Sequence, residues 1–171
     1  MLINGYNPFL FVPEYFINHQ LYPIANAQLL YDGMGLLNGS HYSNYPPINQ
    51  LNFAFAAVFG SNSITLNIIF LRLQIILADI GIIYFGAKIL KFLGQNQNKI
   101  FLYALNPLVI IELTGNLHFE AVMLFFLITS FYFLLTNKII LSALLFGFSI
   151  ATKLIPILFL PLLLYCIGIQ K

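Results

Sequence analysis

The sequence predicts an all-α protein, a polytopic transmembrane helical bundle. Of its 171 residues, 60% are hydrophobic and 7% are charged, and the mean hydropathy is +0.90. These values lie well outside the range of soluble globular proteins. One uncharged apolar run lies between Lys138 and Lys153, a second lies between Lys153 and Lys171, and a third covers residues 121–137. Each run approaches the roughly 20 residues that a bilayer-spanning helix needs. Several spans in series indicate one multi-pass membrane domain.

Residues 1–47 are predicted to form a long extracytoplasmic loop. They are rich in Asn, Pro, Tyr and Gly, and they contain no Lys or Arg, since the first cation of the chain is Arg72. The positive-inside rule assigns segments without Lys or Arg to the outer side of the membrane. The first residues also lack the basic region and continuous apolar core of a secretory signal. We expect the chain to be a fragment of a longer protein that has an upstream helix.

The apolar segment 48–60 follows the tandem prolines Pro46 and Pro47. The second proline can occupy the first turn of a helix. A helix over residues 48–60 would be about 20 Å long, whereas the hydrocarbon layer is about 30 Å thick. We therefore expect a re-entrant or interfacial helix here.

The remaining chain predicts four or five further apolar helices, so that region 48–171 holds five to six. Residues 64–90 are long enough to span a membrane, and they lead into a polar turn that carries Lys88, Lys91 and Lys99. By the positive-inside rule this turn is cytoplasmic. The later helices, of which the first is broken at Asn106-Pro107, are expected over residues 101–113, 117–135, 139–151 and 157–169.

This order of helices places residues 1–47, 112–120 and 152–156 on the extracytoplasmic face. The alternative topology, in which 48–60 spans and every later helix is inverted, would put Lys88, Lys91 and Lys99 outside. The positive-inside rule favours the first topology.

The stretch "ELTGNLHFE" places Glu112, Asn116, His118 and Glu120 at one outward turn. Ionisable groups at the edge of a membrane span are costly and suggest function. Together these side chains offer donors and acceptors to a sugar, or ligands to a cation. His118 and Glu120 can converge only if the helix begins near Phe119, because residues two apart on a helix point about 200° from each other. The non-functional alternative is an acid favoured by the helix dipole and an interfacial histidine.

Lys153, in "ATKLIPILFLPLLL", is the cation of the outward face, at the depth of a lipid phosphate. It could bind a phosphate or diphosphate as a point charge. It could equally be a lysine that extends to the headgroups from a helix end. Arg72 and Asp79 lie seven residues apart on one helix face, and we expect them to neutralise each other or groups on neighbouring helices.

Several function classes are excluded. The seven cations are scattered, which gives no basis for nucleic-acid binding. Cys166 is the single cysteine, which excludes disulfide scaffolds and cysteine metal clusters and leaves a packing role for that residue. The chain contains no Gly-rich phosphate loop and no HExxH motif.

Four stretches, "NGYNPFLFVP", "SNYPPINQLNFAF", "LNPLVIIELTGNLHFEAVMLFFL" and "GFSIATKLIPILFLPLLL", follow one another in an order that resembles the GT-C superfamily of integral-membrane glycosyltransferases. The likeness is to bacterial polyprenol-phosphate-mannose-dependent mannosyltransferases and their PIG-M-like relatives. It implies a hexosyltransferase of the bacterial inner membrane that moves mannose from a polyprenyl-phosphate donor to a glycan or lipid acceptor. The implied partners are these lipids and glycans, with no cofactor and no metal.

The resemblance also assigns roles to residues. Tyr45 and Pro46 would lead the loop back into the membrane, and Asn106-Pro107 with Glu112 would match an Asn-Pro-Leu...Glu segment. His118 and Glu120 match a Gly-His-x-Asp element, in which Leu117 replaces the glycine and Glu replaces Asp. Lys153 and Pro156 match a Thr-Lys-x-x-Pro element that could hold the lipid phosphate.

The family's acidic motif near the end of the first helix would precede the "NPF" stretch, and it is absent from these residues. The expected general base is therefore missing, and Glu120 and Asp32 are the candidate substitutes, although Asp32 could simply be a solvated loop residue. As written, this fragment could be inactive on its own. Two other function classes stay open: a transporter or flippase subunit, and a small non-catalytic membrane protein. Alanine at Glu120 and Lys153 would have no effect in the last case.

Overall fold

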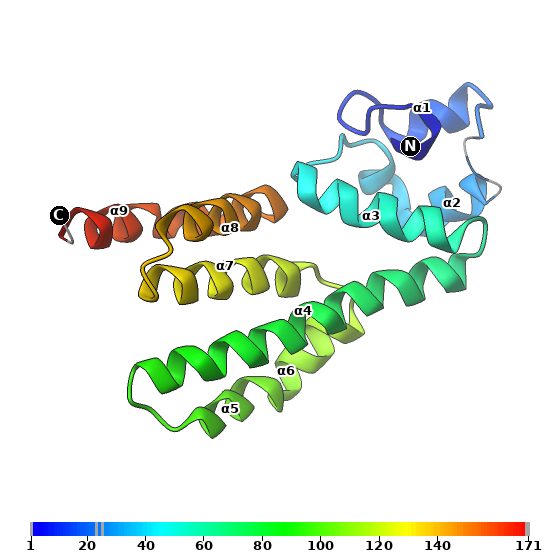
Figure 1. Cartoon of the computed structure of the whole chain (residues 1–171). Helices are drawn as coiled ribbons and strands as arrows, with labels where there is room; N and C mark the ends of the chain where they lie inside the picture. The colour runs from blue at the N-terminus through cyan, green and yellow to red at the C-terminus, as the bar shows by residue number, and fades with distance from the viewer. Residues whose placement is uncertain (1, 23, 25, 170–171) are drawn as a thin grey trace. The chain divides into compact units, whose positions relative to one another are not determined.

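The computed structural model describes residues 2–22, 24 and 26–169, and within them it is helical with no strand (Figure 1). The all-α prediction is confirmed. Lys171, which bounds the last uncharged run of the sequence, lies outside the described residues. The side chain of Cys166 is not described either, so its expected packing role stays a prediction.

The chain divides into two compact units, residues 1–45 with 50–71 and residues 46–49 with 72–171. Within the first unit lie two short helices in the predicted loop, α1 (Pro13–Asn18) and α2 (Ala27–Gly39). Pro13 at the first helical position is pre-organised for α1. Helix α2 is broken at Gly35, whose φ of 76° is accessible to glycine without strain. The N-terminal segment therefore contains more helix than its composition indicated.

Helices α3 (Pro47–Gly60) and α4 (Ile64–Phe92) follow. The start of α3 at Pro47 agrees with the predicted role of the second proline. Helix α4 agrees with the predicted span over residues 64–90. The two helices meet closely at their connection, since a Cβ on Gly60 would lie 2.6 Å from the Asn67 side chain.

The second unit continues with a run of short helices and then longer ones. The 101–113 segment is broken where the sequence predicted, because Pro107 begins a new helix and the Asn106 side chain accepts a hydrogen bond from the Leu108 amide at 3.0 Å. The elements are η2 (Gln97–Ile100), α5 (Phe101–Ala104), α6 (Pro107–Val109), η3 (Ile110–Gly115), α7 (Glu120–Leu135), α8 (Ile139–Thr152), η4 (Ile155–Phe159) and α9 (Leu160–Ile169).

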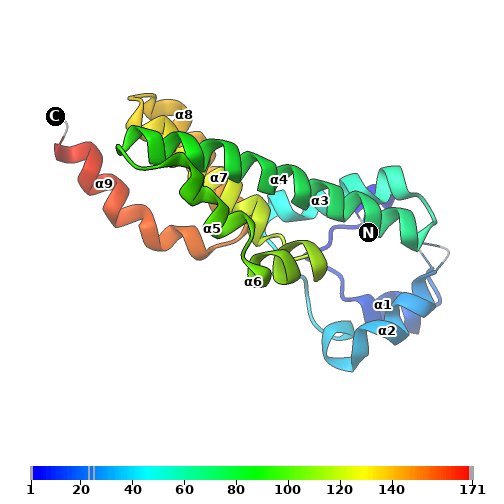
Figure 2. The ribbon, with the colours of Figure 1, turned by 90° about the horizontal axis from the view of Figure 1, so that it is seen from below.

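Helices α7 and α8 form an antiparallel hairpin and lie side by side in Figures 1 and 2. Leu127, Leu134 and Phe146 are buried between them. The Ser130 hydroxyl donates to the Ser142 carbonyl at 2.8 Å, and the Ser149 hydroxyl donates to the Met123 carbonyl at 2.9 Å. Small hydroxyl residues let two apolar helices approach closely and bond across the interface. These bonds set the register of the hairpin.

Helix α4 is, among the described residues, the one continuous helix that is long and apolar enough to cross a membrane. Of its most apolar 18-residue stretch, 17% is buried within the described structure, so most of this stretch is open to its surroundings. The segments Pro107–Gly115 and Glu120–Leu135 pass the same test as a pair but are bent by 115°, and Ile139–Thr152 is apolar but shorter. By length and composition, the described residues thus contain one helix that could cross a membrane, or two if the bent pair is one span. The predicted polytopic bundle of five to six apolar helices is not confirmed by this result.

Candidate functional site

The turn that the sequence predicted over residues 112–120 begins in a π-helix, η3, over Ile110–Gly115. Such wide turns are rare and frequently occur at functional sites. Glu112 lies within it. The chain then turns through Asn116 and Leu117, and Leu117 has a φ of 58°. This left-handed conformation is costly for a branched side chain and natural for glycine. The glycine of the family's Gly-His-x-Asp element would suit the same position.

Backbone and side-chain hydrogen bonds hold this turn in place. The amides of Asn116 and His118 donate to Ile111 O at 2.9 Å and Leu113 O at 3.0 Å. Arg72, from α4, donates through Nε to Thr114 O at 3.2 Å and through Nη2 to a second carbonyl of the turn at 3.4 Å. The guanidinium therefore satisfies carbonyls that a helix end leaves without a partner.

Asp79, seven residues after Arg72 on α4, bonds to Tyr103 and to Thr114, which follow the turn after α4. It accepts hydrogen bonds from the Tyr103 hydroxyl at 2.9 Å and from Thr114 Oγ1 at 3.3 Å. The ion pairs of the described residues include neither Arg72 nor Asp79, and both side chains bond to neutral groups of the following segments instead of neutralising a charge. Both side chains fasten the polar turn to α4.

Glu112 and His118 form the first pair of the site. The His118 Nδ1 lies 3.5 Å from Glu112 Oε2, and the two side chains are about half exposed. A carboxylate beside one ring nitrogen orients the imidazole and leaves the other nitrogen available.

Glu120 and Lys153 form the second pair, in which Lys153 Nζ donates to Glu120 Oε1. Their side chains are 29% and 32% exposed, so the pair is partly shielded from water. The hairpin register explains the pairing, because Glu120 begins α7 and Lys153 directly follows α8. Both residues therefore lie at the end opposite the turn that joins the two helices.

The predicted condition for convergence of His118 and Glu120 is met. Helix α7 begins at Glu120, with Phe119 as its N-cap, and His118 belongs to the turn. His118 and Glu120 flank Phe119, so the two pairs are neighbours along the chain. Glu112, His118, Glu120 and Lys153 thus form one polar group, called the outer cluster below. Asn116 is exposed in the same turn.

The other predicted site residues have local contacts. Tyr45 is 44% exposed and packs edge-to-face on Phe53 with ring centroids 5.4 Å apart. Pro46 is half-buried directly before α3. Asp32 is exposed on α2 and accepts a hydrogen bond from Gln28 Nε2 at 2.9 Å. Tyr45 and Asp32 belong to the first unit, whereas the outer cluster belongs to the second.

The described residues contain no group of three or more His, Cys, Asp or Glu side chains that could hold a metal ion. Glu112, His118 and Glu120, which could have been a ligand set by residue type, do not form one here. The carboxylates instead bind the imidazole and the ammonium.

Asn49 is a site candidate that the sequence did not reveal. Its side chain is 1% exposed, and its amide oxygen and nitrogen have no hydrogen-bond partner among the described residues. Buried polar atoms without partners are rare and require a reason. The residue lies within the quoted "SNYPPINQLNFAF" stretch, but its burial is a property of the tertiary structure.

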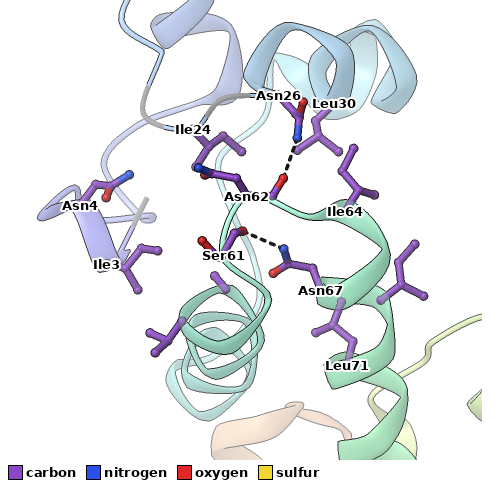
Figure 3. A pocket seen from close by; sticks show the side chains of 13 residues that line it. Ile3, Asn4, Ile24, Asn26, Leu30, Ser61, Asn62, Ile64, Asn67 and Leu71 are labelled. Carbon is purple, nitrogen blue, oxygen red and sulfur yellow. Dashed lines mark hydrogen bonds between the residues drawn. The ribbon is translucent and has the colours of Figure 1, made fainter.

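A cleft of about 520 Å³ lies in the first unit, where the α3–α4 connection faces the N-terminal segment (Figure 3). Its walls are mainly apolar, with Ile24, Leu30 and Ile64 among them, and carboxamides stand at its rim. The Asn26 side chain donates to Asn62 O at 2.9 Å and the Asn67 side chain to Ser61 O at 3.1 Å. No predicted site residue is among those that line it.

The comparisons with known proteins agree with the quoted motifs. The family model of the alpha-(1→6)-mannopyranosyltransferase N-terminal domain, of the MptA_B family, matches residues 21–168. No curated protein and no solved structure matches this chain significantly. The matched region includes α2 to α8, α9 except its last residue, and all residues of the outer cluster. The predicted resemblance to mannosyltransferases of the GT-C type is confirmed, and the chain belongs to the family of alpha-(1→6)-mannopyranosyltransferase N-terminal domains.

Proposed function

We propose that this chain is part of a multi-pass membrane mannosyltransferase that transfers mannose from a polyprenyl-phosphate donor to a glycan or lipid hydroxyl on the extracytoplasmic face. The observation that carries the proposal is the family match over residues 21–168. The outer cluster supports it, because a carboxylate and an ammonium lie together at one end of two apolar helices.

The transfer breaks the bond between mannose C1 and the donor phosphate oxygen and forms a bond between C1 and the acceptor oxygen. The acceptor proton must pass to a base, and the departing polyprenyl phosphate must be stabilised by positive charge. Lys153 is the proposed cation. Glu120 and Asp32 are the candidate bases among the residues present, beside the upstream acid that the family resemblance implies.

The ion pair suggests how these roles are coupled. In the structure Lys153 is bound to Glu120. A donor phosphate carries negative charge and would compete with Glu120 for the ammonium. When Lys153 binds the phosphate, the Glu120 carboxylate is released beside His118 and can accept a proton. Donor binding would thereby free the base only when the leaving group is already in place.

The remaining predicted residues would position the sugars. Glu112 orients His118, and their donors and acceptors suit sugar hydroxyls. Asn116 offers an exposed amide in the same turn. Tyr45 has an exposed ring face of the kind on which a sugar ring can pack, and Pro46 fixes the direction of the chain into α3.

Membrane insertion is proposed from the apolar helices. Helix α4 is long and apolar enough for one full span, and the bent pair and α8 would lie in the same layer. Many large apolar side chains of α8 and η4 are exposed, for example Ile140 at 81% and Leu158 at 76%. Hydrocarbon is the surrounding that these side chains favour. The bacterial inner membrane is the expected location.

The test uses the full-length protein reconstituted with polyprenyl-phosphate-[¹⁴C]mannose. Lys153→Gln should raise the donor KM by about 10- to 100-fold, since a charged hydrogen bond to phosphate contributes about 1.5–3 kcal/mol. Glu120→Gln should mainly lower kcat, by about 10²- to 10⁴-fold if Glu120 is the base. Asp32→Asn tests the second candidate, and Lys99→Gln, whose ammonium bonds to Gln95 at 2.7 Å, is the charge-matched control. Wild-type kinetics in both Lys153→Gln and Glu120→Gln would refute the site.

The face of the membrane is tested separately by cysteine labelling in a Cys166→Ser background. Leu30→Cys and Asn116→Cys should both react with an impermeant thiol reagent from outside, and Gln95→Cys should not. Labelling of residues 30 and 116 from opposite sides would contradict the extracytoplasmic site.

A further inference from the structure

Besides the apolar cleft of the first unit, a cavity with several polar lining residues lies in the second unit, between the end of α4 and the end of α7. It has a volume of about 470 Å³. Tyr84 and Lys88 line it from α4, and Tyr132 lines it from α7. Thr136 and Lys138, from the turn after α7, complete the polar lining. No carboxylate is among its lining residues.

Lys88 is held over this cavity by two aromatic side chains. Its Nζ donates to the Tyr84 hydroxyl at 2.6 Å and lies 4.1 Å from the Tyr84 ring centroid. The same ammonium lies 5.4 Å from the Tyr132 ring centroid. Cation–π contacts of this kind position an ammonium without neutralising its charge. An ammonium has three donors, so donors remain beyond the one that Tyr84 accepts.

Lys138 supplies the second charge from the turn after α7. Its Nζ lies 5.5 Å from the ring centroid of Phe133. Asn137, directly before it, has a φ of 60°, which reverses the chain direction at the end of α7. The ion pairs of the described residues include neither Lys88 nor Lys138. Two cations therefore meet at one cavity without an acidic counter-charge in its lining.

The missing counter-charge points to a bound anion. The two ammonium groups that line the cavity suit the oxygens of a phosphate group, and the aromatic walls suit the apolar glycerol and acyl region next to it. Tyrosine and lysine at the ends of apolar helices are also typical of the membrane–water interface. Lys91 and Lys99 flank the same end of α4, and the positive-inside rule assigns this end to the cytoplasmic leaflet, which contains anionic lipids.

We propose that Lys88 and Lys138, together with Tyr84 and Tyr132, bind the phosphate of an anionic phospholipid headgroup at the cytoplasmic end of α4 and α7. This inference does not depend on the proposed mannosyl transfer, because the outer cluster has no part in it. The site differs from general attraction of basic residues to a membrane, since it depends on the two lysines that line the cavity and not on Lys91 or Lys99.

The experiment is native mass spectrometry of the full-length protein released from mixed phosphatidylglycerol and phosphatidylcholine nanodiscs. The wild type should retain phosphatidylglycerol in preference to phosphatidylcholine. Lys88→Gln with Lys138→Gln should lower this retention by at least about tenfold, since it removes the two charged hydrogen-bond donors that the cavity offers to the phosphate. Lys91→Gln with Lys99→Gln removes the same charge outside the cavity and should retain the lipid. Equal loss in both double variants would overturn the proposal.

Two further arms separate the remaining outcomes. Inorganic phosphate at millimolar concentration should not displace phosphatidylglycerol, and efficient displacement would show a site for free phosphate instead. Tyr84→Phe keeps every charge but removes the acceptor that positions Lys88, and it should lower retention several-fold. If the glutamine double variant does not fold, this variant decides the matter, since unchanged retention in Tyr84→Phe would contradict the site.

Discussion

Helix α7 has charged groups at both of its ends, but the two ends are built differently. At its first residue, Glu120 is paired with Lys153, and Glu112 is paired with His118 one turn away. At its other end, Lys88 and Lys138 contact aromatic rings and line a cavity without a carboxylate. Each end complements the helix dipole, with an acid at the start and a lysine after the last turn. The paired end supplies its own counter-charges, whereas the lining of the cavity at the other end contains lysines and no carboxylate.

The largest expected effect comes from reversing the paired end. Glu120→Lys with Lys153→Glu keeps an ion pair but moves the cation from the end of α8 to the start of α7. We expect the protein to fold normally, and mannosyl transfer to fall by about 10²-fold or more, because preorganised charge near a leaving group contributes at this scale. Radiolabelled transfer assays and thermal unfolding in detergent measure the two properties. Retained activity would show that the pair is structural.

The next feature to test is the close contact between α4 and α7. It lies between the two ends of α7 that are compared above. A Cβ on Gly81 would lie 2.4 Å from the Phe125 ring. Gly81→Ala should therefore destabilise the protein by about 1–3 kcal/mol through overpacking. Gly147→Ala, on α8, meets nothing within 4 Å and should instead stabilise by about 0.5–1 kcal/mol. A fall in unfolding temperature for both variants, or for neither, would contradict the contact.

The turns before and after α7 provide a third comparison, because both contain a residue in the left-handed region. Leu117 has a φ of 58° and Asn137 a φ of 60°. Asn tolerates this conformation, but Leu does not. Leu117→Gly should stabilise the protein by up to about 1 kcal/mol, and Asn137→Gly should change stability by a few tenths of a kcal/mol at most. Chemical denaturation in detergent measures the stability change of each variant. If Leu117→Gly destabilises the protein, the Leu117 side chain contributes more by packing than its backbone conformation costs.

The smallest effect is expected for the hairpin bonds that set the register of the paired end. Ser130→Ala removes the 2.8 Å bond to the Ser142 carbonyl. It should cost about 0.6 kcal/mol, the average for such bonds between membrane helices. Thr129→Ala, which removes a bond to Phe125 O within the same helix, is the matched control and should leave the register unchanged. Crosslinking between cysteines introduced at positions 120 and 153 reports the register directly.

Much of the fold could be predicted from sequence because its signals are local. The breaks at Pro47 and Asn106-Pro107 follow from backbone chemistry. The start of α7 at Glu120 made it possible for His118 and Glu120 to converge. The helices in the first 47 residues were not predicted, because polar, Asn-rich composition says little about where tertiary contacts stabilise a short helix.

Pairing within the site required three-dimensional information. From the sequence, Lys153 could bind a phosphate or extend to the headgroups, and in the structure it bonds to Glu120, thirty-three positions earlier in the chain. That contact depends on the register of α7 against α8, and buried serines set this register. Asn49, the apolar cleft of the first unit and the Lys88–Lys138 cavity likewise depend on which surfaces meet.

The sequence by itself determined that the chain is helical and apolar, where its helices break, and which family it resembles. These properties depend on residue type and local backbone preference, which act over a few neighbouring residues. The tertiary structure decided which charges are paired and which face a cavity. Electrostatic interaction falls with distance in space, and residues far apart in sequence become neighbours only when the helices pack.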